Sequence, residues 1–175
     1  RDSVASRGLG DVYKRQGVNM AQANSIVRMT PDDWSRVRAI RLASLKDSPA
    51  AFSGSYERES QVDEARWRKR LKTITIFMCV KQGHDIGFAT FAVRDGYADL
   101  GGTWVHPAHR GHGAVDALTD AVFTEAQRAG YTEIQLRVFE ENQRAIGAYL
   151  RLGFRMTGEI DRLPDGREAA YMVHT

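Results

Sequence analysis

"VHPAHRGHGAV", at residues 105–115, stands between a strand-like run and a helix-like run. The helical pattern that follows it makes this stretch a strand–loop–helix corner, where unpaired N–H groups and about half a positive charge are expected at the start of the helix. Gly111 and Gly113 keep side chains away from those amides, and Arg110 adds a fork of donors. Because such corners bind phosphate groups, we predict an anion-binding loop, pyrophosphate being its best ligand.

The remainder of the chain predicts one mixed α/β domain. Apolar alternation favours seven strands, and a 3.6-residue period favours four helices. The predicted strands are 25–29, 73–81, 86–94, 97–105, 132–139, 154–160 and 168–175, and the predicted helices are 30–47, 62–72, 113–129 and 142–152. Short Gly-containing links join the second, third and fourth strands, so we expect an antiparallel meander. Gly101-Gly102 indicates a bulge in its last strand.

Charge and composition exclude several function classes. The formal net charge is +3, but residues 1–19 hold four basic and two acidic residues, and the rest holds 21 basic and 20 acidic residues. A nearly balanced domain predicts neither nucleic acid nor a membrane as partner. Cys79 is the single cysteine, so no disulfide can form within the chain, and we expect this thiol to pack in a core strand.

The N-terminal residues 1–19 show neither helical nor strand periodicity, and we expect them to form a non-native or disordered leader. The domain is then predicted to span residues 20–175. No apolar run approaches the ~18–20 residues of a membrane span, and no signal-peptide pattern opens the chain, so we expect a cytoplasmic protein.

Two stretches together, "VHPAHRGHGAV" and "ENQRAIGAYLRLGF" (141–154), resemble the central motifs of the GNAT superfamily of acyl-CoA N-acyltransferases. The resemblance covers about residues 25–174. It implies the GNAT fold, a mixed and mostly antiparallel sheet flanked by helices, with acetyl-CoA as co-substrate. Val115 departs from the Gly or Ala usual at its position. The resemblance implies these cofactor-binding residues: Trp104, Val105, Arg110, Gly111, His112, Gly113, Ala114, Val115, Asn142 and Ala145.

The same resemblance implies two catalytic residues. Tyr149 matches the tyrosine that lies near the thioester sulfur, and we expect it to act as general acid; a packed aromatic is the alternative. Asp99 lies eleven residues before Arg110, where related enzymes keep a carboxylate that acts as general base, and a solvated or hairpin-pairing strand acid is the alternative. Asn142 fits either a cofactor contact or the N-cap of its helix.

Other polar residues near these motifs are expected to have no catalytic role. Glu57 and Glu59 could orient an amine, but an exposed polar loop is their preferred interpretation. The three histidines of the glycine loop lack a carboxylate to complete a metal shell, so we predict no metal site.

The acceptor is the least determined feature of the sequence. The resemblance implies direct attack of a primary amine on the thioester in a ternary complex, and we favour a small-molecule amine. A peptide or protein amine remains an alternative, as does an acyl-CoA-binding regulatory module without catalysis. The C-terminal strands offer a possible homodimer contact.

Overall fold

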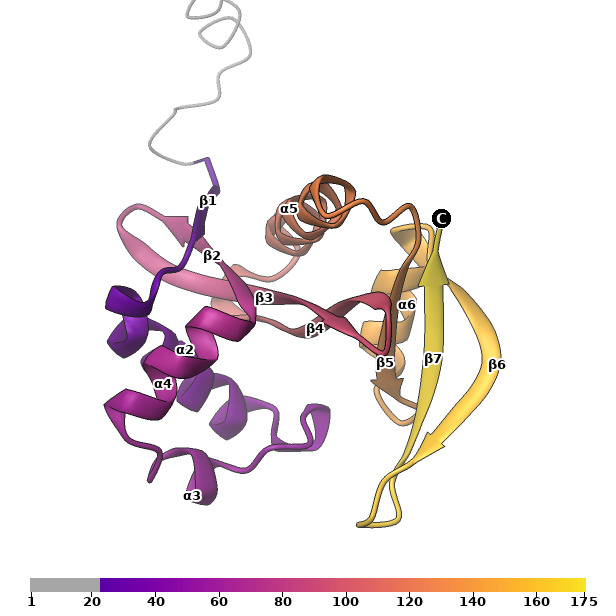
Figure 1. The fold of residues 1–175 in the computed structure, drawn as a ribbon, viewed down its shortest axis with the longest axis horizontal. Helices are drawn as coiled ribbons and strands as arrows, with labels where there is room; N and C mark the ends of the chain where they lie inside the picture. Colours follow the sequence, from indigo (N-terminus) through magenta and orange to yellow (C-terminus); the bar gives the residue numbers. More distant parts are fainter. Residues whose placement is uncertain (1–22) are drawn as a thin grey trace, which may run out of the picture.

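The computed structural model describes residues 23–175, and its centre is one seven-stranded sheet in the order β1-β2-β3-β4-β5-β7-β6 (Figure 1). The strands are β1 (Ser25–Arg28), β2 (Thr75–Lys81), β3 (His84–Arg94), β4 (Tyr97–Val105), β5 (Ile134–Phe139), β6 (Arg155–Arg162) and β7 (Glu168–His174). The helices are α2 (Trp34–Asp47), α3 (Tyr56–Glu59), α4 (Glu64–Thr73), α5 (Ala114–Arg128) and α6 (Gln143–Arg151), with 3-10 turns η2 (Pro31–Asp33), η3 (Pro49–Ala51) and η4 (Pro107–His109).

The predicted fold class is confirmed. All neighbouring strands in the sheet are antiparallel except β4 and β5, which run parallel. The described residues form five α-helices where about four were predicted, and the additional one is α3. Its four residues, capped by Ser55, are too few to produce a helical period in the sequence. The expected leader, residues 1–19, lies outside the described residues.

The β2–β3–β4 meander follows from its turn residues. Gln82 and Gly83 have φ of 50° and 77°, and Asp95 and Gly96 have φ of 51° and 83°. Two consecutive residues with positive φ form the turn whose twist matches a tight hairpin, and Gly adopts this conformation without strain. The two turns fix the register of the three strands, and β4 ends at the loop formed by residues 106–113.

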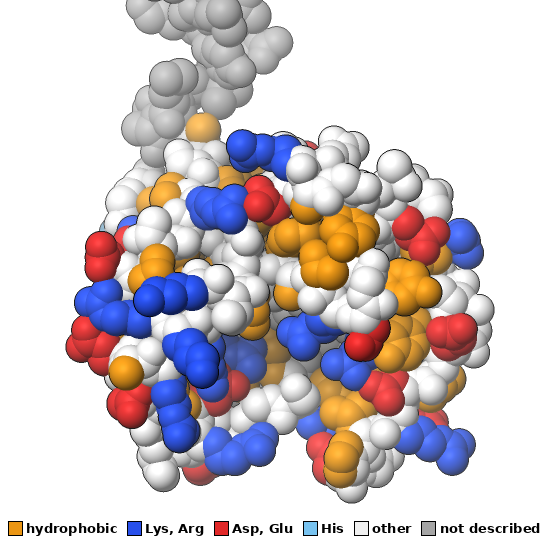
Figure 2. Space-filling model, in the orientation of Figure 1, with side chains coloured by type: hydrophobic (Ala, Val, Ile, Leu, Met, Phe, Trp, Pro, Cys, Tyr) orange, Lys and Arg blue, Asp and Glu red, His pale blue; other side chains and the backbone are white. Residues whose placement is uncertain are grey.

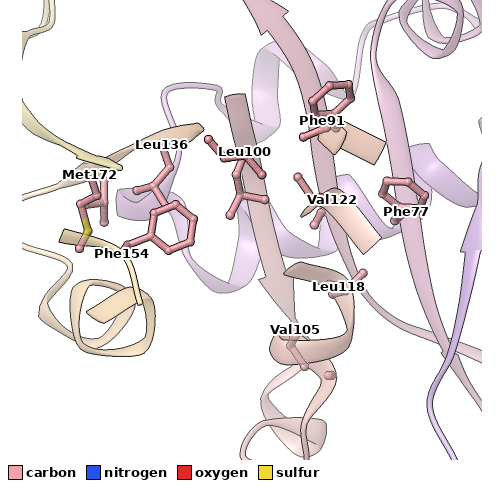
Figure 3. Packing of buried hydrophobic residues seen from close by; sticks show 14 of the residues in the cluster. Phe77, Phe91, Leu100, Val105, Leu118, Val122, Leu136, Phe154 and Met172 are labelled. Atoms are coloured by element: carbon pink, nitrogen blue, oxygen red, sulfur yellow. The ribbon is translucent and has the colours of Figure 1, made fainter. Parts of the chain in front are cut away.

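The sheet separates two apolar clusters, because successive side chains of a strand point to opposite faces. In β2, Phe77 and Cys79 join the cluster that includes α5, whereas Ile76 and Met78 join the cluster that includes α2 and α4. Figure 3 shows Leu118 and Val122 of α5 in one apolar cluster with Leu100, Phe91 and Phe77 of the sheet. Each fully buried side chain of this kind stabilises the fold by about 1.5–3 kcal/mol.

Two further sequence expectations can be compared with this fold. Cys79 is completely buried in β2, as predicted, and burial raises the pKa of its thiol. Within residues 23–175, no helix combines the length and the apolar character that crossing a membrane requires.

Candidate active site

The site begins where β4 and β5 separate. The two strands pair only at Ala98 with Ile134 and at Asp99 with Gln135, and beyond this point they diverge. On the other side of β4, Thr90 alone stands opposite Gly101 and Gly102, which is the predicted bulge. A Cβ on Gly101 would lie 2.2 Å from Thr90 Oγ1, so a larger residue there would force the Thr90 side chain to move. The bulge and the divergence together open the sheet between β4 and β5.

The loop after β4 is open on the side that faces solvent. Gly111 and Gly113 have φ of +76° and +79°, and a Cβ built on either residue would meet no atom within 4 Å. Gly113 is the N-cap of α5 and supplies no side-chain acceptor, so the first amides of this helix have no cap. Bare amides at a helix N-terminus fit a diphosphate, and the loop therefore fits the anionic end of a nucleotide co-substrate.

A cavity of about 720 Å³ extends from this loop to α6 and to the end of α2. Nine of the ten predicted cofactor-binding residues line it, His112 being the exception. The His112 side chain is exposed, and its backbone oxygen accepts a hydrogen bond from Asn24 Nδ2 at 3.1 Å. Asn142 is the N-cap of α6, because its Oδ1 accepts from Ala145 N, and the residue also lines the cavity.

Arg110 is held on the wall of this cavity by its own contacts. Its Nε donates to the Val105 carbonyl at 2.8 Å, and Nη2 donates to Asp47 Oδ2 at 2.7 Å. Asp47 also accepts from Trp104 Nε1 at 2.9 Å, and the hydrogen bonds from Ser48, Trp104 and Arg110 lower its pKa to about 2. The sequence analysis did not identify Asp47, which ties the end of α2 to the glycine loop.

Val115, the departure from the family pattern, lies in the first turn of α5. It is partly buried against the larger apolar cluster and also lines the cavity. Part of its side chain is therefore withdrawn into the core.

A second cavity of about 390 Å³ adjoins the first and is lined by α2, α4 and the middle of β4. The two cavities meet at the residues that line both: Ala51, Phe52, Thr103, Asn142, Ala145 and Tyr149. Asp99 lines only the second cavity. The structure thus brings both predicted catalytic residues to one space, although 50 positions separate them in the chain.

Tyr149 stands at the junction of the cavities. Its ring packs edge-on against Phe154, with centroids 5.6 Å apart, and its hydroxyl forms a hydrogen bond with the Thr103 side chain. Thr103 Oγ1 also donates to the Gly101 carbonyl at 3.1 Å. Burial raises the pKa of Tyr149, and the contact with Thr103 offsets part of this rise. The hydroxyl is therefore protonated near neutral pH.

Asp99 is buried in β4, with 7% of its surface exposed, and this differs from a solvated strand acid. Its Oδ2 accepts from Arg94 Nε at 3.1 Å across the β3–β4 hairpin, which fits the alternative of a hairpin-pairing acid as well as that of a base. Burial raises the pKa of Asp99, while the charges of Arg94 and Arg137 lower it in part, and the balance is upward. A carboxylate with a raised pKa is a stronger base than an exposed aspartate.

The interpretation of Glu59 as an exposed loop residue is wrong. Glu59 is the last residue of α3, and its carboxylate accepts from Arg41 at 2.8 and 3.0 Å and from Arg70 at 3.3 Å. Glu57 lies on the same helix and is exposed. Glu57 and Glu59 are two positions apart on this helix and therefore point to different sides of it. Only Glu59 faces α2 and α4.

The histidines of the glycine loop contact one another and their neighbours. His106 Nδ1 accepts from Ala108 N at 3.1 Å, and its ring lies edge-on to Trp104 and His109. Across residues 23–175, no three His, Cys, Asp or Glu side chains come together in a way that could hold a metal ion.

Comparisons with known proteins agree with this geometry. The acetyltransferase (GNAT) family model matches residues 38–154. Among solved structures, the GNAT-family acetyltransferase of Streptococcus pneumoniae is 17% identical with a TM-score of 0.72, covering 87% of this chain and 98% of that one. The yncA protein of Salmonella typhimurium, solved with its cofactor acetyl-CoA, is 20% identical with a TM-score of 0.69, covering 88% and 94%.

Nourseothricin acetyltransferase shares more sequence over a shorter region. It is 29% identical with a TM-score of 0.53, and the match covers 58% of this chain and 64% of that one. No curated protein sequence matches the chain at the significance required. The family match spans well over half of the chain and includes the glycine loop, both cavities' shared residues and Tyr149. The chain therefore belongs to the GNAT acetyltransferase family and is an acetyl-CoA-dependent acyltransferase.

Proposed function

We propose that the protein transfers the acetyl group of acetyl-CoA to a primary amine of a small molecule by direct attack in a ternary complex. One observation carries the proposal: a cavity that ends at uncapped helix amides meets a second cavity at Tyr149, and the second cavity holds Asp99. Each cavity suits one of two substrates that bind together.

The co-substrate would lie in the larger cavity. The first amides of α5 would bind the diphosphate, and Arg110, fixed by Asp47, would keep the loop in place and add positive charge. The edge of β4 that faces the divergence from β5 offers backbone groups to the amides of the pantetheine arm. When bound, acetyl-CoA supplies an activated thioester.

Tyr149 would protonate the leaving sulfur. Because burial raises its pKa, the hydroxyl holds its proton until a stronger base approaches it. Thr103 orients this hydroxyl, and both residues stand where the cavities join. General acids placed in this way contribute about 10²–10⁴-fold to a rate.

Asp99 would remove the proton from the attacking amine, through a water molecule, because an ammonium group cannot attack a carbonyl. Its burial in the wall of the second cavity raises its pKa toward the working range of a base. Arg94 holds the carboxylate in one orientation.

A covalent acetyl-cysteine intermediate does not fit the chain. Cys79 is completely buried in β2, burial raises the pKa of its thiol, and it lines neither cavity. A small acceptor is favoured by the size of the second cavity, about 390 Å³. The likeness to nourseothricin acetyltransferase supports the same acceptor class.

The test is acetyl-CoA-dependent thiol release against a panel of polyamines, aminoglycosides, amino acids and short peptides, with Tyr149→Phe as control. Release that depends on the acceptor and is lost in the variant supports the proposal. If only long peptides accelerated thiol release, the acceptor would be a protein amine instead of a small molecule. Silence over the whole panel, while acetyl-CoA raises the melting temperature, would favour a binding module.

A further inference from the structure

The second cavity has an excess of positive charge. Four arginines line it, Arg41, Arg70, Arg94 and Arg137, against two carboxylates, Glu59 and Asp99. Figure 2 shows basic side chains inside the hollow between the α2–α4 lobe and the β6–β7 hairpin. A polycationic amine would be repelled from this space, whereas an anionic group would be attracted.

The excess is localised at one of two arginine pairs. Arg94 pairs with Asp99 at 3.1 Å, and Arg137 pairs with Asp161, so each has a carboxylate of its own. Arg41 and Arg70 instead share Glu59. Burial alone would raise the pKa of Glu59, but the hydrogen bonds and charges of the two arginines bring it below its ordinary value. One ionised carboxylate between two guanidinium groups leaves one positive charge uncompensated.

An unused hydrogen-bond donor lies beside this pair. Trp67 is 2% exposed and lines the same cavity, and its Nε1 has no hydrogen-bond partner among the described residues. The Arg70 guanidinium lies over the Trp67 ring, with Cζ 4.6 Å from the centroid. The indole N–H is itself buried and is not open to the cavity, so the contribution of Trp67 is its ring, which stacks on Arg70 and holds this guanidinium in place.

The positive site is close to the proposed reaction centre. Arg41 Nη1 is 3.5 Å from the position that a Cβ on Gly102 would occupy, and Gly102 precedes Thr103, the partner of Tyr149. Apolar side chains make up much of the remaining wall, among them Ile40, Phe52 and Phe88. The cavity thus places an anion site, an apolar wall and the proposed acid and base within about 390 Å³.

We infer that the acceptor is an amino carboxylate with an apolar side chain, whose carboxylate binds the Arg41–Arg70 pair while its amine lies toward Asp99 and Tyr149. This inference rests on the proposed function and narrows its acceptor class. A guanidinium fork binds a carboxylate with two parallel hydrogen bonds, and the apolar wall accommodates the side chain.

The test compares leucine with leucinamide and isoamylamine, which keep the amine and the apolar chain but lack the carboxylate. Initial rates of acetyl transfer are measured on the full chain, and binding of each compound to the protein saturated with CoA is measured by calorimetry. We expect kcat/KM for leucine to exceed that for either analogue by about 100-fold, as for the loss of a charge-assisted contact. We expect the same order in binding.

Two variants of α4 locate the carboxylate. Arg70→Gln is expected to raise KM for leucine about 10- to 50-fold with little change in kcat, and to leave leucinamide unaffected. Arg70→Lys, which keeps the charge but not the fork, should recover only part of this loss. Arg66→Gln is the matched control, because Arg66 is exposed on the same helix and does not line the cavity.

The outcomes separate this inference from the proposed function. Equal or faster acetylation of leucinamide and isoamylamine would overturn the carboxylate site and leave the transferase standing. Carboxylate-dependent binding of leucine without any acetyl transfer would sustain the site and count against the transferase. If the protein preferred the phosphonate analogue of leucine, the group bound at the site would be phosphate-like instead of a carboxylate. Equal binding of all compounds would overturn the site.

Discussion

The two cavities that meet at Tyr149 are built from different parts of the protein. The larger one depends on backbone: two glycines with positive φ, the uncapped first turn of α5, and the edge of a bulged strand. The smaller one depends on side chains that come from α2, α3, α4 and the central strands. A backbone site of contiguous residues leaves a motif in the sequence, whereas a side-chain site assembled from many elements does not.

The difference fits the proposed division of labour. The co-substrate is the same for a whole family, and contacts to backbone do not depend on side-chain identity. The acceptor distinguishes one family member from another, and its site consists of groups that substitution can change, such as the Arg41–Arg70 pair on Glu59. The predictions below begin at the junction of the two cavities and then change one cavity at a time.

The largest effect is expected for Tyr149→Phe, which acts where the cavities join. Loss of the general acid should lower kcat by about 10²–10³-fold, with KM for acetyl-CoA changed less than threefold. Steady-state kinetics with a saturating acceptor measures both constants. A fall in acetyl-CoA affinity without a fall in kcat would assign Tyr149 to the cofactor cavity alone.

Asp99→Asn is expected to lower kcat/KM about tenfold or more at neutral pH, because the amide cannot accept a proton. The pKa of Asp99 is raised, so wild-type activity should fall as the pH drops through this raised pKa and the carboxyl becomes protonated. The variant should lack this acid limb. A pH–rate profile with the limb intact in Asp99→Asn would assign the base to another group.

Gly113→Ala alters the cofactor cavity only. A Cβ beside the first amides of α5 should weaken acetyl-CoA binding about tenfold, and the positive φ of +79° should cost about 1 kcal/mol of stability. Gly130→Ala is the control, because Gly130 follows the other end of α5 with φ of +89° and equally open surroundings. Calorimetry should show the loss of affinity in the first variant alone. Equal affinities would place the diphosphate elsewhere.

The smallest effect is expected for Asp47→Asn, which loosens the loop without touching either substrate. A carboxylate with a pKa lowered to about 2, against an ordinary value of 3.8, stabilises the fold above pH 3.8 and loses this contribution as the pH falls toward 2. The variant should be less stable by about 1–2 kcal/mol at pH 7, since partial exposure screens the interaction. Urea unfolding at pH 7 and pH 3 measures this difference, which should shrink at the lower pH.

What could be predicted from the sequence follows the same division between sites built from contiguous backbone and sites built from distant side chains. The strands, the hairpin turns, the bulge at Gly101-Gly102 and the α5 corner were predicted because each depends on a few contiguous residues. Asp47 was missed, because 63 positions separate it from Arg110 and only the tertiary fold brings them together. Glu59 was misread for the same reason, since its partners lie on two other helices.

The central claim is that an amine in one cavity attacks a thioester held in the other, with no acetyl group passing through the protein. The most direct test mixes the full chain with acetyl-labelled acetyl-CoA, first without and then with the acceptor, and follows labelled protein, free thiol and acetylated amine together. We predict no label on the protein and no free thiol before the acceptor is added. After its addition we predict one thiol for each acetylated amine, and Tyr149→Phe should suppress both products. Labelled protein, or thiol released without acetylated amine, would contradict the account.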